Sequence, residues 1–217
     1  MRLEIYRSKR RTLSVGIAPD GEGYVVRAPA GLSEEYIKDF IENKKDALAK
    51  MRERIIHRQT FFAPYENFEK LSFLGIDYQI VKQNGLKKAV LHENTVYVDG
   101  KNAQKQLKNF LRLAAAEILP KLTDECCKKH SLGFRSLAVR SYKGKWGSCS
   151  KDIDIVLNYK LAMLEPPLIE YVIIHELCHA FHMDHSKLFW LKLSKYLPEA
   201  RKLNKKLKIY TPFCRLF

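Results

Sequence analysis

Residues 172–186 read VIIHELCHAFHMDHS, and this stretch decides how the rest of the chain is interpreted. It begins with apolar residues typical of a buried helix and contains four of the seven histidines. His175 and His179 are four residues apart, so both imidazoles project from one helix face and can hold one ion. Glu176 adjoins the first of them, where its carboxylate can reach a metal-activated water. The pattern His-Glu-x-x-His is the signature of zinc hydrolases.

A catalytic zinc ion usually takes three protein ligands and leaves its fourth position to water. The third ligand we expect is His185, which follows His175 by ten residues, the separation found in the metzincin pattern. His182 is the alternative, because it lies on the same helix face as His175. It would rise about 4.5 Å beyond His179, however, which makes convergence of three side chains on one ion difficult. Otherwise His182 is a residue at the rim of the site.

The choice of His185 requires the helix to end before it. On a straight helix, residue 185 would lie about 9 Å along the axis from His179 and point away from the ion. We therefore expect the helix to end near Met183, with Asp184 as the turning residue because aspartate tolerates left-handed geometry. Ser186 is expected to cap a new helix.

These residues predict hydrolysis by a metal-activated water. Zinc lowers the pKa of water toward ~7 and polarises a scissile carbonyl. Glu176 would act as general base and pass the proton to the leaving amine. The stabiliser of the tetrahedral oxyanion stays open between the metal alone and one of four side chains, namely Tyr142, Asn158, Tyr159 or His182.

The segments before this helix predict strands. Residues 135–142 and 153–161 read as two strands, and prolines at 166 and 167 open the helix, since proline is tolerated in a first turn. The strand over 153–161 either pairs with an extended substrate peptide or is purely structural. Trp146 and Cys149, in the loop between the strands, are expected to pack or position other groups.

The remaining pattern predicts an α+β protein with a zincin-like metal-binding helix and a small antiparallel sheet. Residues 3–27 read as a second small antiparallel sheet, 33–57 as one long helix, 61–100 as short strands, and 103–127 as a helix. We expect an N-terminal α+β region over residues 1–100 and a metallopeptidase region over 101–217.

Charge is the main compositional clue. The chain has 39 Lys and Arg against 24 Asp and Glu, a net charge of +15, and residues 131–217 hold 15 basic and 7 acidic side chains. A basic series after the metal helix is either a solvated face or a contact surface for nucleic-acid phosphates. Its members are Lys192, Lys195, Arg201, Lys202, Lys205, Lys206 and Lys208.

Composition also bears on location. The five cysteines make no paired disulfide framework, which favours reduced thiols. The longest stretch without charged residues, 12–19, is far shorter than the ~18–20 residues of a transmembrane helix, and the N-terminus lacks the apolar core of a signal peptide. We expect a cytoplasmic protein that does not span a membrane.

Several motifs together resemble the YgjP-like zinc metallopeptidases, bacterial and archaeal proteins related to SprT-like and minimal gluzincin proteins. The resemblance spans most of the chain and is carried by 10–11 (RR), 26–29 (VRAP), 73–78 (FLGIDY), 145–150 (KWGSCS), 157–161 (LNYKL), 166–167 (PP), 175–179 (HELCH) and 185–190 (HSKLFW). It implies a zinc ion on His175, His179 and His185, with Glu176 catalytic. The sequence departs from the pattern at Asp184, where members often carry Asn, and at Tyr159, where many carry Trp.

We therefore expect a zinc-dependent metallopeptidase that hydrolyses peptide bonds in a peptide or protein substrate. The alternatives are a nucleic-acid-associated protein with a structural or vestigial zinc site, and a SprT-like protease that acts on DNA-bound protein. Glu176 favours chemistry, because a structural site needs no carboxylate beside its ligand and is usually closed by a fourth side chain.

Overall fold

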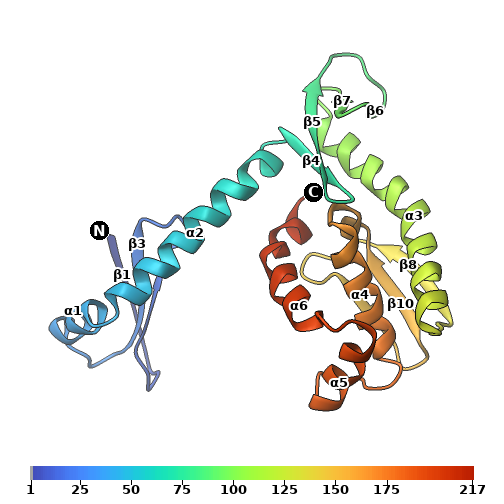
Figure 1. Ribbon diagram of the computed structural model, residues 1–217. Coiled ribbons are helices and arrows are strands. Elements are labelled where there is room, and N and C mark those ends of the chain that lie inside the picture. Colours follow the sequence, from blue (N-terminus) through green and yellow to red (C-terminus); the bar gives the residue numbers. More distant parts are fainter. Residues whose placement is uncertain (1) are drawn as a thin grey trace. The chain divides into compact units, whose positions relative to one another are not determined.

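The computed structural model describes residues 2–217 and confirms the α+β class. Its contacts divide the chain into two compact units, with the boundary between Ala63 and Pro64 (Figure 1). Each unit has its own strands and helices. The boundary expected at residue 100 falls inside the second unit.

The first unit is a small sheet with two helices. Its elements are β1 (Arg2–Ser8), β2 (Ser14–Ile17), β3 (Gly23–Pro29), α1 (Glu34–Glu42) and most of α2 (Lys45–Glu66). Val26, Ala28 and Ile37 form its buried core. Ser33 caps α1 by accepting a hydrogen bond from the Tyr36 amide at 3.2 Å. The single helix expected over 33–57 is in fact two helices.

The second unit contains the rest of the chain. Its elements are β4 (Lys70–Phe73), β5 (Ile76–Lys82), β6 (Val90–His92), β7 (Thr95–Val98), α3 (Ala103–His130), β8 (Ser136–Arg140), β9 (Gly147–Cys149), β10 (Asp154–Asn158), the 3₁₀ helix η1 (Tyr159–Met163), α4 (Pro166–Cys178), α5 (Lys187–Tyr196), α6 (Ala200–Ile209) and the 3₁₀ helix η2 (Thr211–Arg215).

All three sheets are mixed, so the expected antiparallel arrangement is wrong. Their strand orders are β1-β3-β2, β4-β5-β7-β6 and β8-β10-β9. In each sheet, the strand that comes last in the sequence lies between two earlier strands. It runs parallel to one of them and antiparallel to the other. When three consecutive strands alternate in direction, the first and third run the same way. A third strand placed in the middle is therefore parallel to the first and antiparallel to the second, and the sheet is mixed.

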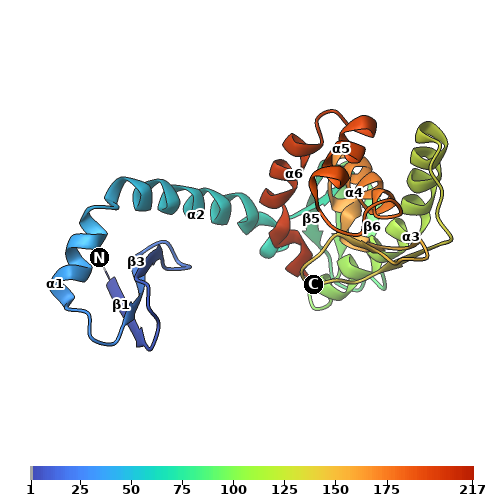
Figure 2. The ribbon, with the colours of Figure 1, turned by 90° about the horizontal axis from the view of Figure 1, so that it is seen from below.

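Helix α4 is the centre of the second unit. It lies between α3 and α6 and also contacts α5, β9 and β10 (Figure 2). Its sequence is apolar on every side, as expected for a helix surrounded by protein. Leu168, Ile173, Ile174 and Leu177 are at most 1% exposed. Burying a large apolar side chain contributes about 1.5–3 kcal/mol, so α4 is a rigid support for the histidines at its end.

The turn between β4 and β5 is tied to η1 and to the start of α4. The Leu74 amide donates to the Ala162 carbonyl at 2.7 Å, and the Ser72 hydroxyl donates to the Met163 carbonyl at 2.7 Å. Gly75 has φ +78°, and a Cβ there would lie 2.8 Å from the Glu165 Cα. Only glycine fits both constraints. These contacts place residues before 100 in the same unit as the metal helix.

Within residues 2–217, no helix is both long enough and apolar enough to cross a membrane. The five cysteines are free thiols. Three of them, Cys126, Cys178 and Cys214, are buried, and burial raises the pKa of each thiol to about 12, 12 and 11 respectively.

Candidate metal centre

Three histidines converge at the end of α4. His175 lies in its last turn, His179 caps its C-terminus, and His185 lies in the segment before α5. Each offers a ring nitrogen within 4.8 Å of the other two, and the Nε2 atoms of His175 and His185 are 2.9 Å apart. Among residues 2–217, no fourth His, Cys, Asp or Glu joins this group. The arrangement leaves room for a fourth, exchangeable ligand.

The chain leaves the helix earlier than expected. Helix α4 ends at Cys178 rather than near Met183, so the following segment has more residues in which to turn back. Asp184 does not adopt the left-handed conformation; its carboxylate instead accepts a hydrogen bond from the Ser186 amide at 3.3 Å. Ser186 caps α5 as expected, accepting from the Phe189 amide at 3.5 Å.

Neighbouring groups orient two of the imidazoles. His179 Nδ1 lies 2.9 Å from the carbonyl oxygen of His182, which can only accept, so Nδ1 carries the proton and Nε2 keeps its lone pair. His175 Nδ1 lies 3.4 Å from the Tyr171 hydroxyl. The side chain of His182 lies outside the histidine group; its contribution is the backbone carbonyl.

Phe189 is a common packing partner of the three histidines. Its ring centroid lies 4.9 Å from that of His175, 4.8 Å from that of His179 and 4.9 Å from that of His185. The side chain is fully buried. The sequence offered one signal for this role, the position of Phe189 four residues after His185 in the first turn of a capped helix.

The surroundings favour the neutral form of His175 and of His185. Burial lowers the pKa of His175 to about 3, with a further contribution from the charges of His179 and His185. Burial also lowers the pKa of His185, again assisted by His179. Neutral imidazoles keep the lone pairs that a metal ion needs. Three imidazole nitrogens fit a metal ion of intermediate softness such as zinc.

Glu176 lies beside the histidines and is 7% exposed. Burial raises the pKa of its carboxyl to about 7, and the charge of Lys145 opposes this shift. Its carboxylate packs directly on Gly147 of β9, where a Cβ would lie 2.7 Å from Oε1. A side chain at position 147 would therefore displace the carboxylate.

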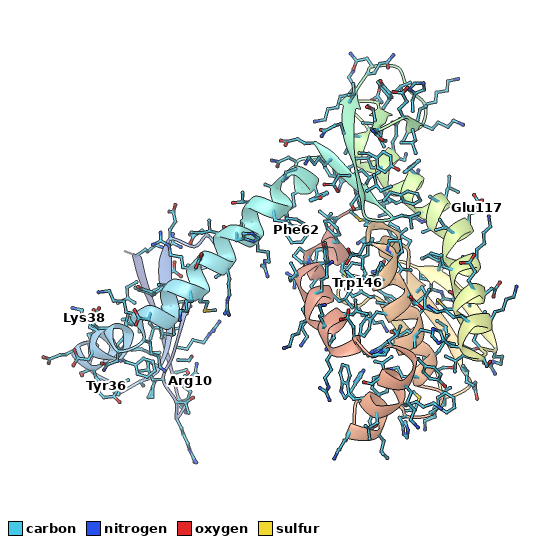
Figure 3. The ribbon with its side chains drawn as sticks, in the orientation of Figure 1. Arg10, Tyr36, Lys38, Phe62, Glu117 and Trp146 are labelled. Atoms are coloured by element: carbon cyan, nitrogen blue, oxygen red, sulfur yellow. The ribbon has the colours of Figure 1, made fainter. Side chains whose placement is uncertain are left out.

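These groups line one cavity of about 420 Å³ between α4, β9 and α6. Trp146, 8% exposed, packs at this point between α4 and α6 (Figure 3). The other polar lining groups include Lys145, Ser148, Tyr171 and Asn204. Lys145 lies within the 145–150 motif, which gives it no individual role. Tyr171 and Asn204 were not identified from the sequence, because they come from two different helices with no motif spacing.

None of the four side chains considered for oxyanion stabilisation lines this cavity. Asn158 is fully buried, and its amide donates to the carbonyls of Tyr142 and Lys145 at 3.0 and 2.9 Å. It therefore fixes the loop before β9. Tyr142 lies 3.2 Å from the Ser148 hydroxyl, and Tyr159 lines a different cavity.

Strand β9, rather than the segment at 153–161, has a free edge at the cavity. β10 lies in the middle of its sheet, so both of its edges are occupied. The Asn158 amide donates to the Trp146 carbonyl, and the Ser150 amide donates to the Asp154 carbonyl. Because antiparallel hydrogen bonds alternate, the backbone groups of Gly147 and Cys149 face away from β10.

Residues 11–210 match the family described as YgjP-like, metallopeptidase domain. No curated protein gives a significant match. Solved structures that are similar to part of the chain include two metallopeptidase zymogens. The metallopeptidase zymogen of Pyrococcus abyssi abylysin has a TM-score of 0.38 and 24% identity over 42% of this chain and 91% of that chain. The metallopeptidase zymogen of Methanocaldococcus jannaschii jannalysin has a TM-score of 0.36 and 21% identity over 42% of this chain and 94% of that chain.

The family match spans most of the 217 residues, and the chain therefore belongs to the YgjP-like metallopeptidase domain family.

Proposed function

We propose that this metallopeptidase is zinc-dependent, with His175, His179 and His185 as ligands and Glu176 as general base. The observation that carries the proposal is the convergence of three imidazoles beside a buried carboxylate in one cavity. The open side of the histidine group leaves room for water and a substrate carbonyl. Zinc, when bound, supplies Lewis-acid chemistry that acidifies water and polarises a carbonyl.

In this proposal Glu176 moves the proton. Its carboxylate accepts a proton from the attacking water and delivers it to the leaving amine. A carboxyl pKa near 7 suits both steps, because the group is neither too weak a base nor too weak an acid at neutral pH. Tyr171 and the His182 carbonyl orient the imidazoles, and Phe189 keeps water from the faces of the rings.

The free edge of β9 is the proposed docking site for the substrate backbone. An extended peptide can add to an exposed strand through main-chain hydrogen bonds. Gly147 and Cys149 present their backbone groups in the direction that such a peptide requires. Because Gly147 also touches Glu176, a peptide on this edge runs past the general base.

A cleavage assay on a panel of unfolded proteins tests the general base. We expect Glu176→Gln to lose at least about 10²-fold in rate while retaining zinc. The matched control is Glu170→Gln, on the same helix but outside the cavity, which should retain activity. Unchanged cleavage by Glu176→Gln would exclude this mechanism.

Metal analysis tests the ligand set. The purified protein should hold one zinc ion per chain, and His185→Ala should bind zinc at least about 10-fold more weakly. His182→Ala should retain zinc, because only its carbonyl supports the site. If His185→Ala binds zinc as tightly as the parent, the three-histidine site is wrong.

Association with nucleic acid through the basic C-terminal series stays a prediction. Several members of the series are engaged with neighbours: Lys192 lies over the Phe181 ring at 3.9 Å, Arg201 over the Trp190 ring at 4.8 Å, and Lys202 and Lys206 pair with Glu199 and Glu165. A mobility-shift assay across salt concentrations tests the idea, because phosphate contacts weaken steeply with salt.

A further inference from the structure

A second cavity, of about 780 Å³, lies between α3, the end of β8 and the start of η1. It shares no lining residue with the cavity at the histidines. Its volume is within the range of about 300–1,000 Å³ that is typical of small-ligand sites. Its lining is basic, as it includes Lys108, Arg112 and Arg140 but no acidic residue.

The three cations have no carboxylate partner within residues 2–217. Lys108 and Arg112 are four residues apart on α3, so their charges face the same side and repel each other. The first acidic residue of α3 is Glu117 (Figure 3). It pairs with Lys121 at 2.9 Å and does not line this cavity. The positive charge of the cavity is therefore not neutralised by the protein.

A buried hydroxyl supplies an independent observation. Tyr159 is 1% exposed and lines the cavity, and its hydroxyl has no hydrogen-bond partner within the described chain. Burial raises the pKa of Tyr159 to about 12, and the charge of Arg112, which lines the same cavity, acts in the opposite direction. A buried hydroxyl without a partner is costly, so such groups usually have a ligand or water to bind.

From these observations we infer that the cavity between α3 and β8 is an anion site that binds a phosphate group. Arginine presents planar pairs of N–H donors that match phosphate oxygens, and lysine adds a third positive charge. Tyr159 donates its hydroxyl proton to the same anion, and Asn109 and Ser141 add polar groups at the rim. A dianion with several acceptor oxygens suits this lining better than a carboxylate does. The inference does not depend on the proposed peptidase mechanism.

Calorimetry and thermal unfolding with inorganic phosphate test the site, with sodium acetate at equal ionic strength as the reference anion. Phosphate should bind and raise the melting temperature by more than acetate does. Arg112→Gln should weaken phosphate binding about tenfold, because it removes charge-assisted hydrogen bonds. Lys105→Gln is the matched control, a cation on the same helix that does not line the cavity, and it should bind like the parent.

Tyr159→Phe gives a second readout. Without phosphate, this variant should melt at a higher temperature than the parent, because an unpartnered hydroxyl is removed from the interior. Its phosphate-induced shift should be smaller than that of the parent. The inference is overturned if acetate stabilises as well as phosphate, if Arg112→Gln binds phosphate like the parent, or if Tyr159→Phe is destabilised without phosphate.

A short single-stranded oligonucleotide distinguishes whether the bound phosphate group belongs to nucleic acid or to a small phosphate compound. If nucleic acid is the source, the oligonucleotide should compete with inorganic phosphate and bind more weakly to Arg112→Gln. If the source is a small phosphate compound, inorganic phosphate should bind without competition from the oligonucleotide. Either result supports the site, and failure of both probes to bind refutes it.

Discussion

At the scale of single residues, Gly147 is the sharpest test of the candidate site. We expect Gly147→Ala to reduce cleavage about 10–100-fold, because a Cβ 2.7 Å from Oε1 forces the Glu176 carboxylate to move. Zinc content should stay the same, since no proposed ligand is displaced. Gly144→Ala is the control, because its Cβ would meet nothing within 4 Å. Full activity of Gly147→Ala would show that the position of the carboxylate is not critical.

Phe189 should be important for the stability of the fold around the histidines. Replacing this buried ring by alanine leaves a cavity beside all three imidazoles and should lower the free energy of unfolding by about 3–5 kcal/mol. Denaturant unfolding of the metal-free protein measures this effect. Phe181→Ala, at a ring that is 49% exposed, should cost much less. Equal losses for the two variants would contradict the packing role of Phe189.

At the scale of elements, the segment between α4 and α5 should depend on the metal. His185 lies in this segment, and Phe181 and Met183 within it are each 49% exposed. Removing zinc with a chelator should therefore increase proteolysis within residues 180–186, which mass spectrometry of the fragments can locate. The exposed loop at 143–145 is an internal reference whose cleavage should not change. A segment equally resistant with and without chelator would argue against His185 as a ligand.

Asp154 connects β8, β9 and β10, and it makes their sheet sensitive to acid. Hydrogen bonds from the Arg135 guanidinium and the Ser136 hydroxyl lower the pKa of its carboxyl to about 2. An unfolded aspartate has a pKa of about 3.9, so the ionised carboxylate stabilises the fold above that pH, and the contribution is lost as the pH falls toward 2. Asp154→Asn should unfold more easily than the parent at pH 6, and the difference should shrink toward pH 2. Asp124→Asn, at an exposed site on α3, should show no such trend.

The sequence predicted those parts of the site that depend on local spacing. The pairing of His175 with His179 on one helix and the Ser186 cap follow from neighbours three or four residues apart. The order of strands depends instead on contacts between distant segments, so the central place of β10 and the free edge of β9 were missed. Tyr171 and Asn204 were missed for the same reason, since two separate helices, α4 and α6, bring them to the cavity at the histidines.

At the scale of the whole molecule, the boundary between the units can be tested with two fragments. A chain starting at residue 64 keeps every residue that lines the cavity at the histidines. It also keeps every contact between β4, β5 and η1. We expect it to fold and to bind zinc. A chain starting at residue 101 loses the hydrogen bonds of Ser72 and Leu74 and should melt at a lower temperature. Circular dichroism and metal analysis distinguish the outcomes, and equal stability of the two fragments would favour a boundary near residue 100.

Insertion of the last strand has a consequence during synthesis on the ribosome. Strands β8 and β9 leave the ribosome before β10, but they do not pair with each other in the finished sheet. Each of them pairs with β10 instead. The edge that is proposed to hold substrate therefore forms only after residue 158 has left the ribosome, and the histidines follow later still. The nascent chain therefore lacks the proposed site until His185, the last of the three histidines, has been made.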